Sequence, residues 1–330
     1  MKAAALIDDM PVEPRPYTDR DHGSAGDVAE CHALLARGSK SFAAAAHLLP
    51  RRVRDASAVL YAFCRVADDA VDLGHEADRV ERLRRRLARV YEGEGLEGPV
   101  DRAFADVVRR FDLPMEVFTA LFEGFEWDAR GRTYETLSDT LSYAARVAST
   151  VGAAMTAIMG CREPHMLARA CDLGLAMQLT NIARDVGEDA ASGRLYLPAD
   201  WLLAEGVDPA AFLRDPQPLP GVRRVVLQLL EVADGLYALG DAGLAALPRD
   251  VRPAMLAARF IYADIGRVIR AADGDSVTSR AFVSGGRKGL LLGRALLSSF
   301  RAPDSLLHEP PTPETTFLVE AISGISRQPG

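Results

Sequence analysis

Two groups of oxygen-bearing side chains stand at helical spacing in this sequence. The first acidic cluster is Asp68, Asp69 and Asp72, and the second acidic cluster, an amide with two carboxylates, is Asn181, Asp185 and Asp189. Residues four apart share one helical face, so the second cluster would line about 12 Å of its helix. Carboxylate and amide oxygens are ligands that Mg²⁺ prefers, and bound Mg²⁺ often contacts phosphate oxygens as well. The two clusters together predict a magnesium site, with Mn²⁺ as a substitute, that holds a diphosphate between two helices.

The surroundings of the clusters decide between a metal site and a solvated surface. An aspartate pair at i and i+4 is by itself as readily a solvated helix face as a binding site. Residues 56–67 and 166–180, however, are apolar nearly all round, which is typical of buried helices. A buried carboxylate is costly unless it is paired or bound to metal, and Arg65 and Arg184 are too few to balance these acids. We therefore expect bound cations, with Tyr61 and Gln178 on the same two faces.

The elements that would position these side chains are all predicted to be helices. Stretches rich in Ala, Leu, Arg and Glu are separated by Pro and Gly near residues 49–50, 93–99, 160–164, 216–221 and 248–253, without strand patterns or repeats. The fold class is accordingly all-α, a single-domain, many-helix bundle with a central active-site cavity. We expect a disordered arm over residues 1–26, the helical domain over 27–302 and a Pro-rich, frayed tail over 303–330.

Composition excludes several other classes of protein. The net charge of −7 offers no positive field for nucleic acid. The four cysteines form no zinc-binding pattern, and no segment is long enough for a signal peptide or a membrane span. We expect a reduced, cytoplasmic protein that can still rest peripherally on the inner membrane face. The G-x-G-x-x-G match at 93–98 follows an Arg-rich helix rather than a strand, so we interpret it as a loop and not as a nicotinamide or flavin site.

Longer motifs around the two clusters resemble the squalene/phytoene synthase family. The matching segments, within a resemblance that covers about residues 30 to 290, are GSKSF (38–42), YAFCRVADDAVD (61–72), QLTNIARDVGED (178–189) and GRLYLP (193–198). The N-x-x-x-D-x-x-x-D spacing of the second acidic cluster is the form found in head-to-head synthases of this family. It differs from the second motif of terpene cyclases and from the second D-D-x-x-D of chain-elongating prenyltransferases.

The resemblance assigns roles to individual residues. It implies metal binding by the six residues of the two clusters and substrate binding by Gly38, Ser39, Lys40, Ser41, Tyr61, Arg65, Gln178, Arg184, Tyr262, Arg280 and Lys288. The residues implied in catalysis are Asp68, Asp72, Asp185, Asp189, Arg65, Tyr196 and Tyr262. Ala145 and Ser149 stand where the family commonly has a tyrosine and a glycine, so that tyrosine's role is not transferred. The small residues from 144 to 154 would either line a tunnel or let helices pack closely.

The resemblance also implies a reaction. Two geranylgeranyl diphosphates would be joined head to head through a cyclopropylcarbinyl diphosphate, prephytoene diphosphate, to give phytoene and released diphosphate, as in a 15-cis-phytoene synthase. Magnesium would be required, and no NADPH is expected. One alternative is a C30 synthase of the dehydrosqualene or squalene type that uses farnesyl diphosphate. The other is a catalytically silent assembly protein of the same family, in which eroded acidic motifs would be expected.

Overall fold

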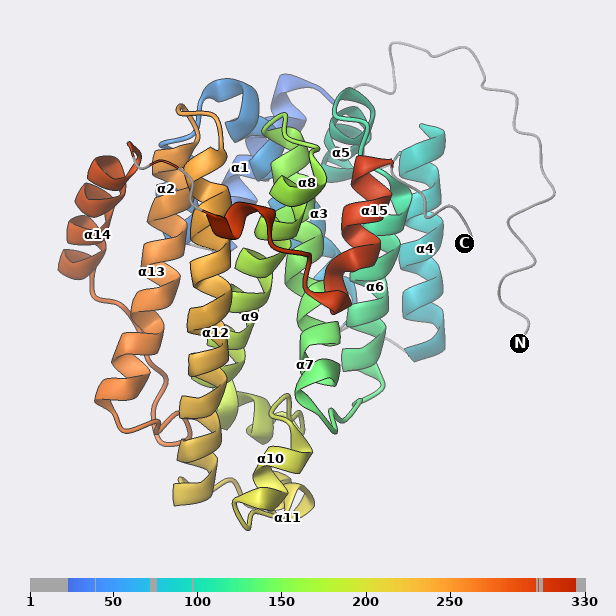
Figure 1. Cartoon of the computed structure of the whole chain (residues 1–330). Helices are drawn as coiled ribbons and strands as arrows, with labels where there is room; N and C mark the ends of the chain where they lie inside the picture. The colour runs from blue at the N-terminus through green and yellow to red at the C-terminus, as the bar shows by residue number, and fades with distance from the viewer. Residues whose placement is uncertain are drawn as a thin grey trace, which may run out of the picture.

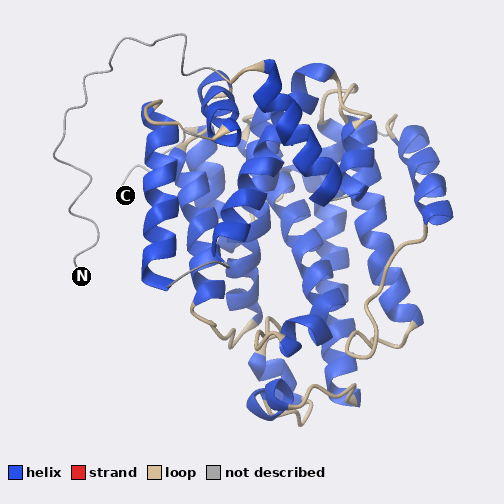
Figure 2. Ribbon diagram, turned by 180° about the vertical axis from the view of Figure 1, so that it is seen from behind, coloured by secondary structure: helices blue, strands red, loops and turns tan. Residues whose placement is uncertain are grey.

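The computed structural model describes residues 23–38, 40–71, 76–96, 98–300, 302 and 305–324, and every regular element in these ranges is helical (Figure 2). This confirms the predicted all-α class. The first half contains α1 (Ala25–Gly38), α2 (Lys40–Ala46), α3 (Arg51–Val71), α4 (Glu76–Glu92), α5 (Pro99–Arg110), α6 (Met115–Ala129), α7 (Leu137–Ala144), the π-helix η2 (Ala145–Ser149) and α8 (Thr150–Ile158). The second half contains α9 (Pro164–Ala191), α10 (Ala199–Ala204), α11 (Pro209–Arg214), α12 (Pro220–Ala246), α13 (Arg252–Ala271), α14 (Gly285–Ser298), η3 (Ser305–His308), η4 (Pro313–Thr315) and α15 (Thr316–Ser323).

Helix α9 lies in the middle of the bundle and carries the second acidic cluster. It has 28 residues and starts at a proline, which suits the first turn of a helix because no hydrogen bond from its nitrogen is needed there. It packs along α12 and also contacts α8, α13 and η2 (Figure 1). Because neighbours surround it, the sequence of α9 is apolar on nearly every face, as predicted. The Pro and Gly breaks named above all fall between helices or in the first turn of the next helix.

Helix α3, which carries the first acidic cluster, is fixed by an aromatic core. The Phe63 ring stacks on Phe104 of α5 with centroids 3.8 Å apart and contacts Phe118 and Phe122 of α6. All four rings are at most 1% exposed. Burying such rings stabilises a protein by about 1.5–3 kcal/mol each. These contacts hold α3 with its opposite face, which bears Tyr61, Arg65 and Asp68, toward the interior cavity described below.

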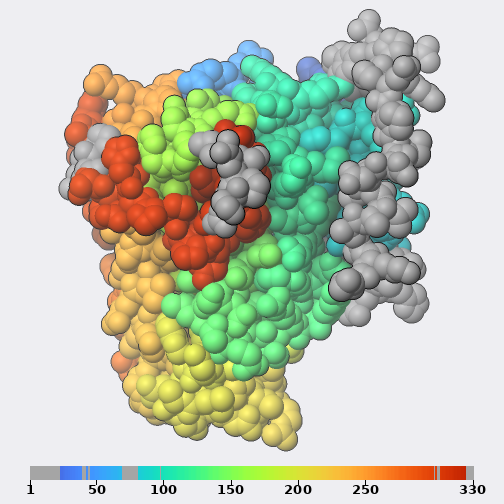
Figure 3. Space-filling model, turned by 45° about the vertical axis from the view of Figure 1, so that its right-hand side comes forward, coloured from blue at the N-terminus to red at the C-terminus, as the bar shows by residue number. Residues whose placement is uncertain are grey.

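The C-terminal segment differs from the frayed tail expected over 303–330. Residues 305–324 form η3, η4 and α15, and α15 contacts α6, α8 and α9 (Figure 3). The Arg169 side chain of α9 is completely buried and donates hydrogen bonds to the carbonyls of Leu306, Glu309 and Pro310. Pro-rich composition indicated a lack of regular structure but could not show that carbonyls of this segment satisfy a buried guanidinium. The boundaries at 26 and 302 stay predictions, and most of the predicted arm lies outside the described residues.

None of the helices in the described ranges combines the length and apolar character that a membrane crossing requires.

Candidate active site

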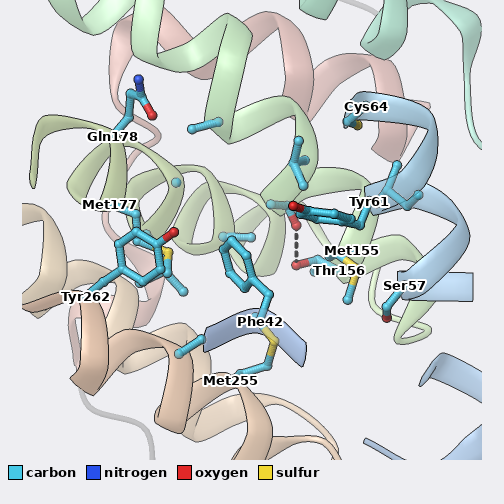
Figure 4. A pocket seen from close by; sticks show the side chains of 18 of the residues that line it. Phe42, Ser57, Tyr61, Cys64, Met155, Thr156, Met177, Gln178, Met255 and Tyr262 are labelled. Atoms are coloured by element: carbon cyan, nitrogen blue, oxygen red, sulfur yellow. Dashed lines mark hydrogen bonds between the residues drawn. The ribbon is translucent and has the colours of Figure 1, made fainter. Parts of the chain in front are cut away.

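A cavity of about 550 Å³ runs through the bundle between α2, α3, α8, α9 and α13. Helix α9 alone lines it from Met166 to Asn181, about 22 Å at 1.5 Å per residue. Most of the wall is apolar, with methionine, leucine, alanine and aromatic side chains (Figure 4). The charged and amide groups that line it, apart from Arg169 at the far end, come from α3, α6 and the later turns of α9: Arg65, Asp68, Asp128, Gln178 and Asn181. The cavity therefore suits a long apolar chain with a polar head.

Asp68 of the first acidic cluster lines this cavity. Tyr61, Arg65 and Asp68 line it from one face of α3, as their spacing predicted. The Asp68 side chain is 51% exposed, and Arg65 Nη1 lies 3.5 Å from its Oδ2 atom. The expectation that both clusters are buried is thus wrong for Asp68, because the apolar body of α3 ends before the aspartates begin. The side chain of Asp69 and all of Asp72 lie outside the described residues, so their metal-binding role stays a prediction.

Asn181 in the second acidic cluster lines the cavity and presents a buried oxygen acceptor. Its Nδ2 atom donates to Gln178 Oε1 at 3.2 Å, while its Oδ1 atom is buried without a hydrogen-bond partner. Leaving a buried acceptor unsatisfied costs about 1–3 kcal/mol. Such an acceptor is suited to a ligand that brings a donor or a cation, and this is the clearest structural sign that the second cluster binds something.

Asp185 is held between two arginines in the described structure. The Nε atoms of Arg184 and Arg280 each donate to Asp185 Oδ1 at 2.7 Å. Burial alone would raise the pKa of Asp185, but the hydrogen bonds from both arginines bring it below its ordinary value. Arg280 is 95 residues away in sequence, so the fold assembles this group. Arg184 and Arg280 thus lie at the second acidic cluster, and their predicted role in substrate binding stays a prediction.

Asp189 completes the second acidic cluster one turn further along α9. Burial and the neighbouring Asp185 raise the pKa of this carboxyl to about 7, with smaller contributions from Asp128 and Glu188 and a partial offset from Arg194. A desolvated carboxylate among other acids is electrostatically unfavourable until a cation joins it. The Asp189 carboxyl and the unsatisfied Asn181 oxygen, about 12 Å apart along the helix, are therefore separate oxygen donors of the kind that a divalent cation such as Mg²⁺ takes.

The described part of the chain does not form a complete metal site by itself. Within it, no three Asp, Glu, His or Cys side chains lie close enough together to hold an ion. In those residues the Asp185 carboxylate is engaged by Arg184 and Arg280. A diphosphate that drew Arg184 and Arg280 toward its own oxygens would free the Asp185 carboxylate for a cation.

The sequence analysis missed Asp128, an acid of α6 that lines the cavity. The hydroxyls of Tyr143 and Tyr196 donate to its two oxygens at 2.8 and 2.6 Å, and the two tyrosine rings stack with centroids 4.8 Å apart. Burial raises the pKa of both phenols well above the usual range. Tyr143 lines the cavity, whereas Tyr196 is 8% exposed and is not part of its wall. The sequence signal that could have identified Asp128 is its place as the one aspartate of α6, near the end of this largely apolar helix.

Aromatic rings form a wall beside the polar end of the cavity. Tyr262 of α13 lies 5.5 Å from Phe42 of α2, and Phe42 lies 6.4 Å from Tyr61, between ring centroids (Figure 4). Burial raises the pKa of Tyr262. Tyr61 and Tyr262 line the cavity together with Phe42, and the predicted contact of the two tyrosines with substrate stays a prediction. The faces of such rings attract positive charge.

Four of the other predicted substrate contacts, Gly38, Ser39, Lys40 and Ser41, are consecutive in the sequence. Gly38 is the last residue of α1, and a side chain there would place its Cβ 2.2 Å from the Tyr61 hydroxyl oxygen, so the Tyr61 ring would have to move. Ser39 and the side chains of Lys40 and Ser41 lie outside what the structure describes. Lys288, in the first turn of α14, does not line the cavity. The predicted contact of Lys288 with substrate therefore stays a prediction.

Gly187 is a positioning residue that the motif contains but the sequence analysis did not single out. Its backbone N–H donates to Ser276 O at 3.0 Å, and a Cβ on it would lie 2.5 Å from Val277 O and 2.9 Å from Val277 Cα. The loop pressed against this glycine leads directly to Arg280. The absence of a side chain at Gly187 therefore lets the loop approach α9 closely enough for Arg280 to reach Asp185.

The small residues between 144 and 154 both line the cavity and allow helices to pack closely, the two roles between which the sequence did not decide. Ala148, Val151 and Gly152 line the cavity. The same stretch also packs tightly on α9: a Cβ on Gly174 would lie 2.8 Å from Ser149 Cα, and one on Gly152 would lie 2.8 Å from Ala170 O. Close helix packing and the cavity wall are thus properties of the same residues.

This geometry defines a class of protein: an all-α isoprenoid synthase, in which a helical bundle encloses an apolar cavity with acidic helices at one end. The chain belongs to the squalene/phytoene synthase family, whose model matches residues 35–287. It is therefore a prenyltransferase-type enzyme.

Characterised relatives and solved structures agree with this family. The chain is 51% identical to phytoene synthase of Rhodobacter capsulatus over 303 residues, covering 89% of each chain. It is 49% identical to phytoene synthase of Cereibacter sphaeroides over 322 residues, covering 93% of this chain and 91% of that one. A dehydrosqualene synthase with bound ligand superposes with a TM-score of 0.74 at 31% identity, covering 82% of this chain and 95% of the other. Squalene synthase HpnC from Alicyclobacillus acidocaldarius superposes with a TM-score of 0.70 at 28% identity, covering 75% of this chain and 94% of the other.

Proposed function

We propose that this enzyme joins two geranylgeranyl diphosphates head to head, through a cyclopropylcarbinyl diphosphate, to phytoene with release of diphosphate. The observation that carries the proposal is the long apolar cavity whose polar end brings together Asp68, Asp128 and Asn181. Relatives that are about half identical over most of the chain carry the name phytoene synthase, which favours the C20 substrate and the C40 product. The cavity and the intact second acidic cluster favour an active enzyme over a catalytically silent assembly protein, in which eroded acidic motifs would be expected.

The residues at the polar end would assist departure of the diphosphate. The six residues of the two acidic clusters, Asp68, Asp69, Asp72, Asn181, Asp185 and Asp189, would hold Mg²⁺, which would supply Lewis-acid stabilisation of the leaving group. Arg184 and Arg280 bind phosphate oxygens and neutralise the charge that develops.

The apolar part of the cavity would protect the resulting allylic cation. Phe42, Tyr61 and Tyr262 present ring faces that stabilise positive charge, and the methionine- and leucine-rich wall excludes water. Tyr262 lines the cavity and remains a candidate for assisting the final proton loss. Tyr196 instead acts as a positioning residue that orients Asp128. Since the reaction would end in proton loss, NADPH is not required.

The products distinguish this proposal from its C30 alternative. Purified enzyme is incubated with C15 or C20 diphosphate, with and without Mg²⁺ and NADPH, and the hydrocarbons are identified by mass. We expect phytoene from the C20 diphosphate with Mg²⁺ alone. A C30 hydrocarbon as the sole product, or a reduced product formed only with NADPH, would replace the proposal by a dehydrosqualene or squalene synthase.

Binding of metal and diphosphate should appear as a change in thermal stability. We expect Mg²⁺ with inorganic pyrophosphate to raise the Tm, since a ligand present at about 100 times its Kd stabilises the folded state by about 2.7 kcal/mol. Asp68→Ala and Asp185→Ala should each lose this shift. Asp234→Ala, whose side chain is 60% exposed and pairs with Arg270 on the outside, should keep it. An undiminished shift in both site variants would contradict the metal assignment.

Gly187→Ala should lower kcat/KM by about 10- to 100-fold, because displacing the 276–280 loop takes Arg280 away from Asp185. The matched control is Gly235→Ala in α12, where a new Cβ meets no atom within 4 Å. That variant should keep its activity and gain about 0.5–1 kcal/mol of stability. Equal activity of the two variants in steady-state assays would show that the loop contact does not position Arg280.

We also propose that the protein works in the cytoplasm and contacts the inner face of the membrane.

A further inference from the structure

Asp128, near the end of α6, lines the cavity without belonging to either acidic cluster. In the described residues two carboxylates line the cavity, those of Asp68 and Asp128. Asp68 belongs to the first acidic cluster, which is predicted to hold metal, and its side chain is 51% exposed. Asp128 is partly buried. It is therefore the one carboxylate of the described wall to which no metal-binding role is assigned.

Two tyrosines hold the Asp128 carboxylate in place. The Tyr143 hydroxyl donates to Oδ2 at 2.8 Å, and the Tyr196 hydroxyl donates to Oδ1 at 2.6 Å. The two rings stack on each other, and the Tyr134 ring packs against both, with centroids 5.3 and 5.6 Å away. Tyr143 and Tyr196 are 5% and 8% exposed, so packing fixes their hydroxyls. Hydrogen bonds to both carboxylate oxygens favour the ionised form, which is the form that can accept a proton.

The face of α6 that lines the cavity changes from apolar to charged at Asp128. Leu121, Phe125 and Asp128 line the cavity and follow one another at helical spacing. The charge of Asp128 also contributes to raising the pKa of Asp189 in the second acidic cluster. The Asp128 carboxylate thus lies at the boundary between the apolar wall and the polar end. A hydrocarbon cation would be left at this boundary when its diphosphate departs.

The proposed reaction ends with the loss of a proton from such a cation. A C–H bond next to the cationic carbon breaks, its electron pair forms the new C=C double bond, and a base takes up the proton. Because the cation is a strong acid, the position of the base matters more than its strength. Among the other groups of the described wall, Arg65 and Arg169 are already protonated, and Gln178 and Asn181 are neutral amides. The Tyr262 phenol is neutral as well, since burial raises its pKa.

We propose that Asp128 accepts the proton that is lost in the final step, an inference that rests on the proposed function. The charges cancel in this step, because the cation and the carboxylate become a neutral hydrocarbon and a carboxylic acid. Tyr143 and Tyr196 are positioning residues that hold the carboxylate in place at the cavity wall. A negative charge fixed there also stabilises the cation before the proton moves. Transfer of the proton to water after the product leaves restores the carboxylate.

Prephytoene diphosphate supplied as the substrate tests the second half of the reaction alone. Asp128→Asn keeps the size of the side chain and an oxygen that accepts a hydrogen bond, but the amide does not take up the proton. We expect the ratio of phytoene to C40 alcohols to fall by about 10²- to 10⁴-fold, the usual effect of removing a general base. Water would capture the cation that keeps its proton. A purely structural role of Asp128 would lower all products together and leave the ratio unchanged.

The control variants separate proton transfer from positioning. Asp241→Asn changes an aspartate of α12 that also accepts hydrogen bonds on both oxygens, from Arg259, and that does not line the cavity. Its product ratio should equal that of the wild type. Tyr143→Phe and Tyr196→Phe each remove one hydrogen bond from Asp128 and leave its carboxylate in the site. Both should lower the ratio, and by less than Asp128→Asn does.

Two results would overturn the assignment of Asp128. A wild-type product ratio in Asp128→Asn would give the proton to the departed diphosphate or to Tyr262. Recovery of the wild-type ratio at saturating Mg²⁺ would make Asp128 a metal ligand instead. Formation of prephytoene diphosphate from geranylgeranyl diphosphate by the wild-type enzyme is measured on the same preparations. Its absence would contradict the proposed function, whereas its presence with an unchanged ratio in Asp128→Asn would contradict only the role of Asp128.

Discussion

Replacing Asp185 by asparagine should slow product formation by about 10²- to 10³-fold or more and leave the helical fold in place, in line with the loss of one preorganised electrostatic group from an active site. Asparagine has the size of aspartate, so α9 and its packing on α12 are undisturbed. What changes is charge: Arg184 and Arg280 lose their shared carboxylate, and the second acidic cluster loses a candidate magnesium ligand. Single-turnover rates at saturating substrate measure the effect on chemistry separately from substrate binding.

The matched control for this substitution is Asp234→Asn. Asp234 also accepts a hydrogen bond from an arginine, Arg270, but it lies on the outer side of α12 with a side chain that is 60% exposed. Its single-turnover rate should be within experimental error of the wild type. If Asp185→Asn retained a comparable rate, the second acidic cluster would not be the site at which the diphosphate departs.

Replacing Asp172 by alanine should destabilise the protein by about 3–5 kcal/mol, because it removes one partner from a fully buried ion pair. Arg169 Nε and Asp172 Oδ2 are 2.8 Å apart and both side chains are 0% exposed. Burial raises the pKa of Asp172 while bonds from Thr312 and Arg169 lower it, and the balance lies above its ordinary value. The variant would leave a guanidinium inside the protein without its charge partner and Thr312 without its acceptor.

The control substitution makes the role of burial measurable. Asp234→Ala breaks an ion pair with the same residue types at the surface, where such pairs contribute about 0–1 kcal/mol. Urea denaturation of the two variants in parallel should show a much lower midpoint for Asp172→Ala. Similar midpoints would mean that the C-terminal segment is held by its apolar contacts and not by this ion pair.

Local sequence patterns predicted the parts of the site that lie on single helices. The spacing of Tyr61, Arg65 and Asp68 correctly placed them on one face, and the apolar sequence before Asn181 correctly indicated a helix inside the bundle. Periodicity could not show whether a face meets solvent, which is why the exposure of Asp68 was wrongly predicted.

The contacts that could not be predicted join residues far apart in the chain. Asp128 accepts hydrogen bonds from Tyr143 and Tyr196, the second of them 68 residues away, and no local pattern specifies such a pairing. The family resemblance placed Arg280 near the diphosphate but did not show that Arg280 pairs with Asp185. Long-range assembly of this kind depends on how the loops and helices pack, as the fit of Val277 against Gly187 illustrates.

The buried Arg169 has a practical consequence for handling the protein. Arg169 lines the cavity, and its guanidinium donates hydrogen bonds to carbonyls of residues that follow it by 137 to 141 positions. A truncation that ends the chain before Leu306 would remove those carbonyls. Water could then reach the Arg169 guanidinium. The segment 305–324 thus keeps Arg169 out of contact with water without lining the cavity itself, and affinity tags belong at the other terminus.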